Sequence, residues 1–388
     1  MNRLMDKTAK APLALPPNFI NTFPTTSNEP TRSLMLCNAR RYLRELPYPL
    51  PCDLAEYHRQ NLSTQIRVKV LGRPICSPWE NASPPRRVLE LCCGTAYWST
   101  LCHDYLQSHG VPNVAFTGLD VVAAPPDLGK QGMDWRFVQH DIRNVPLPFD
   151  DAEFDVVMLK DVALTLYQGV QSQRVLDEVV RILKPGGFLE FWETDHILRS
   201  LLPHSPLSKS ASGGDSAISS GAFLMGPGTP FATAQNKYIK DYNTWIHEAL
   251  AERKLPSAPC AILAEMLLQE SELLKDFGYR RVAIPLAETR WEHDMGEDET
   301  STDSDSTSDS PPQIRKGLNP DQLALRNSCL VTVIQMIEAL EPLLRDVSGK
   351  SEDEWQRWWA GMTSSLLEGN GMTNGECLEA GAWWARKV

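Results

Sequence analysis

The sequence predicts an α/β fold organised around a doubly wound, mostly parallel sheet. The first observation is a short apolar strand at residues 88–91, followed by a tight turn of small residues at 93–96. After the turn, apolar residues recur at helical spacing from Trp98 until Gly110 ends the run. The second observation is a series of later strands that end at acidic residues. A strand, a small-residue turn and a helix open such a sheet, and ligands lie across the carboxyl ends of its strands.

The remaining elements follow in an order that repeats this unit. The strands expected after the first are residues 114–120, 135–140, 154–159, 188–192 and 281–286. Helices with one apolar face are expected over residues 175–183, 238–250 and 262–274. The second strand ends at Asp120, and the third is followed by Asp141. The fourth is followed by Lys160 and Asp161, so several charged side chains are expected at the carboxyl edge of the sheet.

Glu90 lies in the first strand, just before the turn, where a phosphate-binding loop would place no anion. Backbone N–H groups at a helix N-terminus attract a negative ligand, and a carboxylate beside them would repel it. A carboxylate here suits a ligand that carries an ammonium group. At the end of the second strand, Asp120 can accept two hydrogen bonds from a ribose diol. The alternatives are that each acid is a solvated turn residue and that the stretch is an ordinary strand–turn–helix unit.

Several stretches resemble the class I S-adenosylmethionine-dependent methyltransferases. Residues 87–96, Arg-Val-Leu-Glu-Leu-Cys-Cys-Gly-Thr-Ala, resemble motif I of that family, whose acidic residue faces the methionine moiety of the cofactor. Leu-Pro-Phe, Phe-Asp-Val-Val and Leu-Lys-Pro-Gly-Gly further along resemble the same family, and the resemblance covers residues 87–193. The sequence departs from motif I at Cys92 and Ala96, where the family usually has glycine and its access to positive φ. As a whole chain, the sequence resembles fungal methyltransferase-domain proteins with a type 11-like core.

The resemblance implies a seven-stranded Rossmann-like sheet, S-adenosylmethionine as the cofactor, and methyl transfer as the reaction. It implies cofactor contacts from the turn, the next two strand ends and the fourth strand: Glu90, Cys92, Cys93, Gly94, Ala96, Asp120, Val121, Asp141, Ile142 and Leu159. In this set, Asp141 would accept a hydrogen bond from the adenine amino group, and Ile142 would pack on the ring. The catalytic candidates are Lys160 and Asp161, with Asp161 as a base or, alternatively, as a helix N-cap. His140 and Tyr167 are further candidates.

Composition divides the chain into five segments. Residues 1–35 are expected to be disordered, and residues 36–86 to form a helical extension that packs over the cofactor site or merely covers the sheet edge. Residues 87–290 form the predicted methyltransferase core, with an insertion at 200–260 that carries a helical lid. Residues 291–318 form an acidic disordered linker. Residues 319–388 form a Trp-rich helical segment, which packs on the core or offers a surface to a protein partner.

Composition and charge disfavour several classes of protein. The net charge of −11 comes mostly from residues 288–310, which sum to −8, so no basic face for a nucleic acid is expected. No run approaches the roughly 20 apolar residues of a membrane span, and no secretory signal is expected. A mitochondrial presequence is the alternative for the basic N-terminus. The nine scattered cysteines predict reduced thiols, no metal site, and a cytoplasmic or nuclear protein.

The sequence leaves three functions open. The first is an enzyme, a transferase that methylates an unidentified small molecule or protein. The second is a methyltransferase-like regulatory or scaffold protein, in which Cys92 and Ala96 have weakened the cofactor site. The third is a nicotinamide dehydrogenase on a related sheet. This last is disfavoured, because the chain lacks G-x-G-x-x-G after the first strand and has a carboxylate before the turn.

Overall fold

The computed structural model describes residues 34–44, 46, 48–81, 83–166, 168–203, 215–292, 317–368 and 371–388. Four sets of predictions lie outside the described residues. They concern residues 1–33, part of the insertion at 204–214, the acidic stretch at 293–316, and Tyr167.

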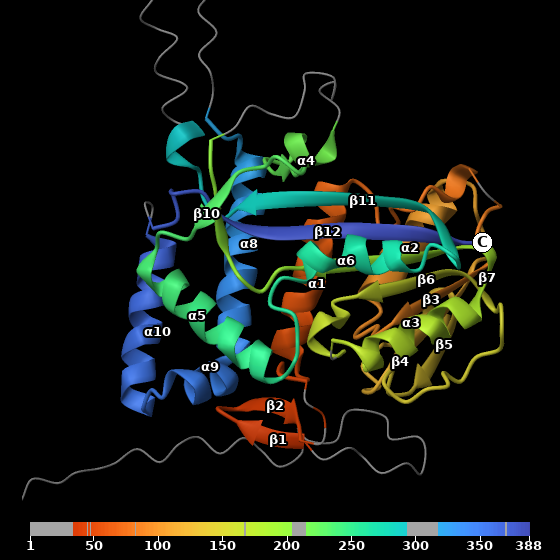
Figure 1. Ribbon diagram of the computed structural model, residues 1–388, viewed down its shortest axis with the longest axis horizontal. Coiled ribbons are helices and arrows are strands. Elements are labelled where there is room, and N and C mark those ends of the chain that lie inside the picture. The colour runs from red at the N-terminus through yellow and green to blue at the C-terminus, as the bar shows by residue number, and fades with distance from the viewer. Residues whose placement is uncertain are drawn as a thin grey trace, which may run out of the picture.

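Five parallel strands form the part of the sheet that carries the predicted site (Figure 1). They are β3 (Arg87–Leu91), β4 (Ala115–Asp120), β5 (Asp134–Gln139), β6 (Phe154–Lys160) and β7 (Leu183–Thr194). Their order across the sheet is β5-β4-β3-β6-β7, and neighbouring strands are parallel. The strand order therefore reverses between β3 and β6, which is the point where doubly wound sheets bind ligands. The predicted α/β fold with a mostly parallel sheet is confirmed.

Beyond β7 the sheet continues with a strand from the far end of the chain. β12 (Glu376–Lys387) lies antiparallel between β7 and β11 (Leu274–Pro285). This strand corrects the expectation that residues 319–388 are helical throughout. Alanine and glycine, which are frequent in β12, are poor strand formers, so the local pattern did not indicate a strand. Hydrogen bonding to β7 and β11 on its two sides overrides this preference. At Gly381 a side chain would not fit, because a Cβ there would lie only 2.7 Å from the Trp383 ring.

Three short strands extend the sheet to ten strands, three more than the predicted seven. They are β8 (Arg199–Leu201), β9 (Phe223–Leu224) and β10 (Phe231–Thr233). β8 and β10 lie at one edge, and β9 pairs with β11. The other short elements are the 3-10 helices η2 (Trp79–Asn81), η3 (Leu128–Gln131) and η4 (Val162–Leu164), and the helix α4 (Ser216–Ser219).

Helices cover both faces of the parallel strands. They include α2 (Tyr97–Ser108), α3 (Val170–Ile182) and α6 (Pro259–Gln269). Successive strand residues belong to two separate apolar clusters: Val88 packs in a cluster with Trp98 of α2, and Leu89 in one with Val175 of α3. This alternation follows from the two-residue period of a strand, and it builds a core on each side of the sheet.

The N-terminal extension begins with a hairpin, which corrects both the disorder expected up to residue 35 and the helix expected from residue 36. β1 (Leu34–Cys37) pairs antiparallel with β2 (Arg40–Leu43). Asn38 and Ala39 join them with φ of +48° and +62°, which suits the tight two-residue turns of hairpins. The helix α1 (Leu54–Leu71) follows, with the Asp53 side chain accepting from the Glu56 N–H at its start.

Four helices gather at one end of the molecule, at the left of Figure 1. They are α5 (Lys237–Glu252), α8 (Pro320–Ala339), α9 (Glu341–Ser348) and α10 (Glu352–Leu367). Asn319 and Gln322 form a capping box at the start of α8, where the sequence predicts an N-cap. The ring of Trp245 in α5 packs at a tilt against that of Trp358 in α10, and their centroids lie 4.8 Å apart. The expected lid helix α5 is therefore packed against the C-terminal helices.

No single helix among the described residues is long and apolar enough to cross a membrane. α8 and α9 together reach that length and composition, but the pair bends by 63°. Cys329, Val333 and Ile337 of α8 are buried within the protein.

Candidate active site

The turn between β3 and α2 has a left-handed backbone at three positions. Cys92, Gly94 and Ala96 have φ of +56°, +53° and +57°. For a residue with a Cβ atom, this conformation costs about 1–2 kcal/mol, which glycine avoids. The two positions where the sequence departs from motif I are therefore those where the backbone takes a glycine-like conformation. The turn keeps its shape, but under strain.

Glu90 lies beneath this turn and is fully buried. Its Oε2 accepts hydrogen bonds from the Ser99 N–H at 3.2 Å and from the Ser99 hydroxyl at 2.6 Å. The other oxygen, Oε1, has no partner among the described residues. Burial raises the pKa of Glu90 to about 7, although Lys160 opposes the rise. The orphaned oxygen can accept a hydrogen bond from a cationic ligand.

Asp120 ends β4 and is bonded to the same turn. Its Oδ2 accepts from the Gly94 N–H at 2.8 Å, and its Oδ1 accepts from the Val122 N–H at 3.1 Å. These two bonds fix the carboxylate, and each oxygen keeps a second lone pair. Burial raises the pKa of Asp120, while the backbone N–H donors oppose that rise. The strand end and the turn are thus held together through one side chain.

Asp141 follows β5 and pairs with a residue of its own turn. Arg143 donates from Nε to Oδ1 at 3.0 Å and from Nη2 to Oδ2 at 2.8 Å. The next residue, Ile142, is buried. An adenine amino group would have to share the Asp141 carboxylate with Arg143.

A cavity of about 80 Å³, here called the cofactor cavity, lies along this edge of the sheet. Its lining residues from the parallel sheet and the loops after its strands include Cys92, Gly94, Asp120, Val121, His140, Asp141, Ile142, Lys160 and Asp161. The N-terminal extension lines it with Leu43, Leu46, Tyr48, Pro51, Cys52, Tyr57 and Gln60. The extension covers this edge of the sheet, whereas the described part of the insertion at 200–260 contributes nothing to the lining.

Asp161 lies directly after β6, where two cations hold it. Arg67 of α1 donates from Nη1 to Oδ1 at 2.7 Å and from Nη2 to Oδ2 at 2.6 Å. The Lys160 Nζ lies 3.3 Å from Oδ2. Burial alone would raise the pKa of Asp161, but the two cations outweigh it and hold the pKa well below its usual range. A carboxylate stabilised in this way is a weak proton acceptor, so it is better suited to positioning than to base catalysis.

A second cavity, of about 50 Å³, adjoins the first and shares Tyr48, Gln60 and Asp161 with it. Its other lining residues come from the loop before α1, from α1, η4, the end of β7 and the residues just after it, α8 and β12. They are Leu50, Arg59, Ser63, Leu164, Thr194, His196, Thr332, Val333, Met336 and Leu378. We call it the acceptor cavity. Burial lowers the pKa of its one histidine, His196, to about 4.

The predicted site residues separate into a cavity wall and a layer beneath it. Cys92, Gly94, Asp120, Val121, Asp141, Ile142, Lys160 and Asp161 are in the wall. Glu90, Cys93, Ala96 and Leu159 are buried and are not in the lining. The predicted N-cap role of Asp161 is not seen, because its side chain caps no N–H of η4. Sequence reasoning missed Arg67, whose partner Asp161 is 94 positions away along the chain. It also missed Thr194 and His196, which line the acceptor cavity.

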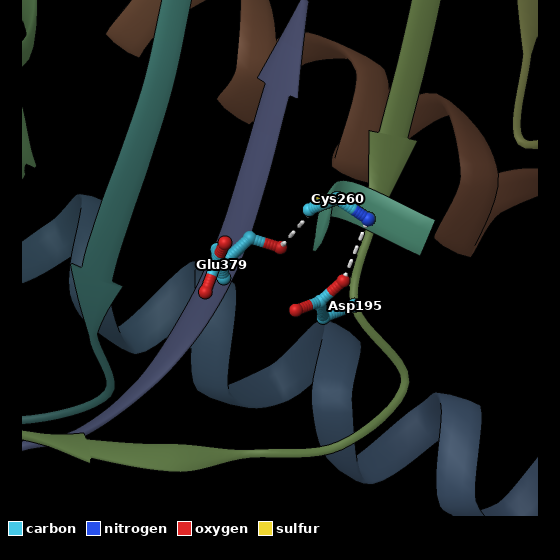
Figure 2. Close-up of side chains that lie close together, drawn as sticks. All are labelled: Asp195, Cys260 and Glu379. Atoms are coloured by element: carbon cyan, nitrogen blue, oxygen red, sulfur yellow. Dashed lines mark hydrogen bonds between the residues drawn. The ribbon is translucent and has the colours of Figure 1, made fainter. Parts of the chain in front are cut away.

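A buried cluster lies near the end of β7 and joins three elements (Figure 2). Asp195, Cys260 and Glu379 bring possible metal-ligand atoms within 4.8 Å of one another. Asp195 Oδ1 accepts from the Cys260 N–H at 2.9 Å. Both Glu379 oxygens pair with arginines, Arg199 and Arg281, whose positive charges oppose a metal ion. We interpret the cluster as an internal ion network.

Comparison with known proteins assigns this part of the chain to a family. Residues 88–187, which run from β3 into β7, match the model of the methyltransferase domain. We call this segment the methyltransferase domain, after the model that it matches. The strained turn and Asp120 lie inside the methyltransferase domain, whereas most of the acceptor cavity lies outside it.

The methyltransferase domain has relatives among curated proteins. Demethylmenaquinone methyltransferase of Listeria monocytogenes is 29% identical over 146 residues, which cover 36% of this chain and 57% of the relative. The protein of the same name from Staphylococcus epidermidis is 33% identical over 118 residues, 29% of this chain and 45% of the relative. The chain thus spans about half the length of the curated relatives it matches.

Solved structures show weaker likeness. The YcgJ protein from Bacillus subtilis is 12% identical, with a TM-score of 0.37, over 85% of this chain and 99% of the other. Phosphoethanolamine N-methyltransferase 2 of Haemonchus contortus, solved with S-adenosyl-L-methionine, is 12% identical, with a TM-score of 0.35. The match covers 84% of this chain and 57% of the other.

Proposed function

We propose that this chain is an enzyme that transfers a methyl group from S-adenosylmethionine to a small-molecule or protein acceptor. The observation that carries the proposal is the orphaned Glu90 Oε1 beneath a turn that Asp120 holds in place. A buried, unpartnered carboxylate oxygen matches the ammonium group of this cofactor, and the spare lone pairs of Asp120 match a ribose diol.

The donor types in the wall of the cofactor cavity, and Glu90 in the buried layer beneath it, fit the parts of S-adenosylmethionine. Glu90 would take the ammonium group, Asp120 the ribose, and Ile142 the adenine ring. Gly94 exposes only its backbone to the cavity. A Cβ at this position would crowd the covering helix α1, because it would lie 3.2 Å from Gln60 Oε1. The bound sulfonium supplies an activated methyl group and its own leaving group. The residues around it therefore mainly align the reactants and exclude water.

Lys160 and Asp161 would position rather than deprotonate. Arg67 and Lys160 keep the Asp161 carboxylate ionised and fixed at the wall shared by the two cavities. A carboxylate fixed in this way can orient a ligand at the wall that the two cavities share, because Arg67 and Lys160 already balance its charge. Tyr48 and Gln60 of the N-terminal extension complete the cover and limit the access of water.

Calorimetry with S-adenosylmethionine tests the proposal, with NAD as the control ligand. Saturable binding of the first and none of the second is the expected result. If S-adenosylmethionine does not bind up to about 1 mM, an affinity near −4 kcal/mol, the enzyme proposal fails.

A second candidate is a regulatory or scaffold protein that has lost cofactor binding. Two observations favour it: the strained non-glycine residues in the turn, and the pairing of Asp141 with Arg143. A partner surface built from the C-terminal tryptophans would not serve this role, since Trp355, Trp358 and Trp383 are buried. The same calorimetry distinguishes the two candidates.

A further inference from the structure

Buried polar atoms without partners gather in the acceptor cavity. Both ring nitrogens of His196 and the hydroxyl of Thr194 make no hydrogen bond to any of the described residues. His196 is only 7% exposed, and its backbone is fixed because its N–H donates to Ser257 O at 2.9 Å. Leaving such groups unpaired in the interior is costly, so these atoms point to a polar ligand.

The charges that line this cavity are already compensated. Arg59 donates to both carboxylate oxygens of Glu56, at 2.9 and 2.5 Å. Asp161 is held by Arg67 through both of its oxygens. An ammonium group or a carboxylate would therefore enter without a counter-charge, which is unfavourable in a buried site. A neutral ligand that both donates and accepts a hydrogen bond meets no such penalty.

The acceptor cavity also has the position that methyl transfer requires. It shares Tyr48, Gln60 and Asp161 with the cofactor cavity, so ligands in the two cavities would be neighbours. Apolar side chains, including Leu50, Val333 and Met336, form much of its remaining wall. At about 50 Å³ it admits only a short part of a ligand.

We propose that the acceptor cavity takes the neutral hydroxyl end of the methyl acceptor, with His196 as the group that receives the hydroxyl proton. The inference rests on the proposed function and specifies its acceptor class as an alcohol or a phenol. The acceptor oxygen forms a bond to the methyl carbon while the carbon–sulfur bond of the sulfonium breaks. The proton passes to His196, and the products are a methyl ether, a thioether and an imidazolium that returns its proton to solvent.

The environment of His196 keeps the ring neutral but makes it a weak base, so it takes the proton only as the acceptor oxygen gains positive charge on bonding to the methyl carbon. Burial lowers the pKa of the imidazole, the negative charge of Asp161 opposes that change, and Arg59 adds to it. The ring is therefore neutral at pH 7, with one nitrogen able to accept a proton and the other able to donate a hydrogen bond. Thr194 offers a second hydroxyl contact from the end of β7.

Three small probes of matched size and different charge test the ligand class: 1-propanol, propylammonium and propionate. Each is titrated into the full chain, free and saturated with S-adenosylhomocysteine, while NMR follows the imidazole ¹⁵N resonances. His196→Phe assigns the His196 signals. We expect 1-propanol to shift these signals saturably and the two ions to leave them unchanged. Thr194→Val should weaken the response to 1-propanol about 3- to 10-fold, the loss expected for one hydrogen bond.

Matched controls separate this inference from the proposed function. His109→Phe alters an exposed histidine that lines neither cavity and should leave the response to 1-propanol unchanged. His196→Phe should keep its affinity for S-adenosylmethionine within about 2-fold. If 1-propanol shifts nothing, the cavity holds water alone and the inference falls. If propylammonium or propionate shifts His196 equally well, the acceptor class is wrong. If S-adenosylmethionine does not bind, the proposed function fails. The 1-propanol titration of the free chain still measures ligand binding in the acceptor cavity, so the two failures can be told apart.

An acceptor screen completes the test. Alcohols, phenols and amines are offered to the full chain, and S-adenosylhomocysteine formation is measured. Product should form with hydroxyl acceptors, and His196→Gln should lower kcat more than it changes KM. Turnover confined to amines would overturn the inference.

Discussion

Arg67 holds both carboxylate oxygens of Asp161, at 2.7 and 2.6 Å, and so ties helix α1 to the end of strand β6. The two residues lie on opposite sides of the boundary between the N-terminal extension and the methyltransferase domain. The pair fixes the cover of the cofactor cavity to the strand that lines it. It also explains, with Lys160, why the Asp161 carboxylate is held ionised.

Removing Arg67 should therefore loosen this cover. We expect Arg67→Met to lower the free energy of unfolding by about 1–3 kcal/mol, because charged hydrogen bonds are lost and Asp161 is left with Lys160 alone. Urea unfolding measures the change. Arg67→Lys should be almost as unstable as Arg67→Met, since a lysine cannot make the two parallel hydrogen bonds to Asp161. In a double-mutant cycle with Asp161→Asn, a coupling energy near zero would contradict the prediction.

Glu90 should make stability fall as pH rises from about 4.5 to about 7. In that range the folded chain keeps a proton on Glu90, whose pKa burial raises to about 7, while the unfolded chain has lost it. The folded state therefore binds more protons, and raising the pH disfavours it by up to about 3 kcal/mol. Glu90→Gln should remove this part of the slope in urea unfolding at pH 5 and pH 8. Glu248→Gln, at an exposed position on α5, is the control and should leave the fall of stability with pH unchanged. If Glu90→Gln also leaves that fall unchanged, the raised pKa of Glu90 is not its cause.

Asp120→Ala should weaken S-adenosylmethionine binding by roughly 10- to 150-fold, through loss of a charge-assisted hydrogen bond of ~1.5–3 kcal/mol. The same change removes the bond to the Gly94 N–H, so the turn should also loosen. Asp120→Asn is the matched control, because its amide oxygen still accepts one bond. Calorimetry that finds the wild-type dissociation constant in Asp120→Ala would rule out the ribose role.

Ala96→Gly should relieve strain without harming the site. The left-handed backbone at Ala96 costs about 1–2 kcal/mol, against which glycine loses one buried methyl group of about 0.8 kcal/mol. We expect unfolding free energy to stay level or rise by up to about 1 kcal/mol, with little change in cofactor affinity. Ala249→Gly, near the end of helix α5, is the contrasting control and should destabilise by about 2 kcal/mol, through about 1 kcal/mol of helix preference and about 0.8 kcal/mol of methyl burial. A clear loss of stability in Ala96→Gly would show that the methyl contacts outweigh the strain.

Deleting residues 295–312 should leave the melting temperature within a few degrees. This stretch lies outside the described residues, but its flanks do not: the Leu318 N–H donates to Glu288 Oε1 at 3.4 Å. The two ends therefore lie together, and a shorter connection can join them at little entropic cost. Differential scanning fluorimetry of the deletion checks this, and a large drop would mean that the stretch is docked on the core.

The parallel half of the fold was predictable because its signals are local. The run from Val88 to Leu91 is apolar, and the small residues after it make a turn. Asp120, Asp141 and Asp161 each follow a strand, and parallel strands bring such ends to one edge. Their presence together in one cavity wall agrees with this reasoning.

The rest depends on contacts that no local pattern carries. β12 is rich in alanine and glycine, and it becomes a strand only because β7 and β11 pair with it on both sides. Arg67 meets Asp161 across 94 positions in the chain. His196 and Thr194 look like ordinary turn residues in the sequence. Their significance lies in the missing hydrogen-bond partners among the described residues, which only the three-dimensional arrangement reveals.

The central place of β12 has a consequence for synthesis of the chain. On the ribosome, β7 and β11 emerge long before residues 376–387, and in the finished sheet each pairs with that later strand rather than with the other. Until then both present open hydrogen-bonding edges, which invite association with other chains. Completion of the nascent sheet, and with it the Leu378 wall of the acceptor cavity, therefore awaits the translation of its central strand.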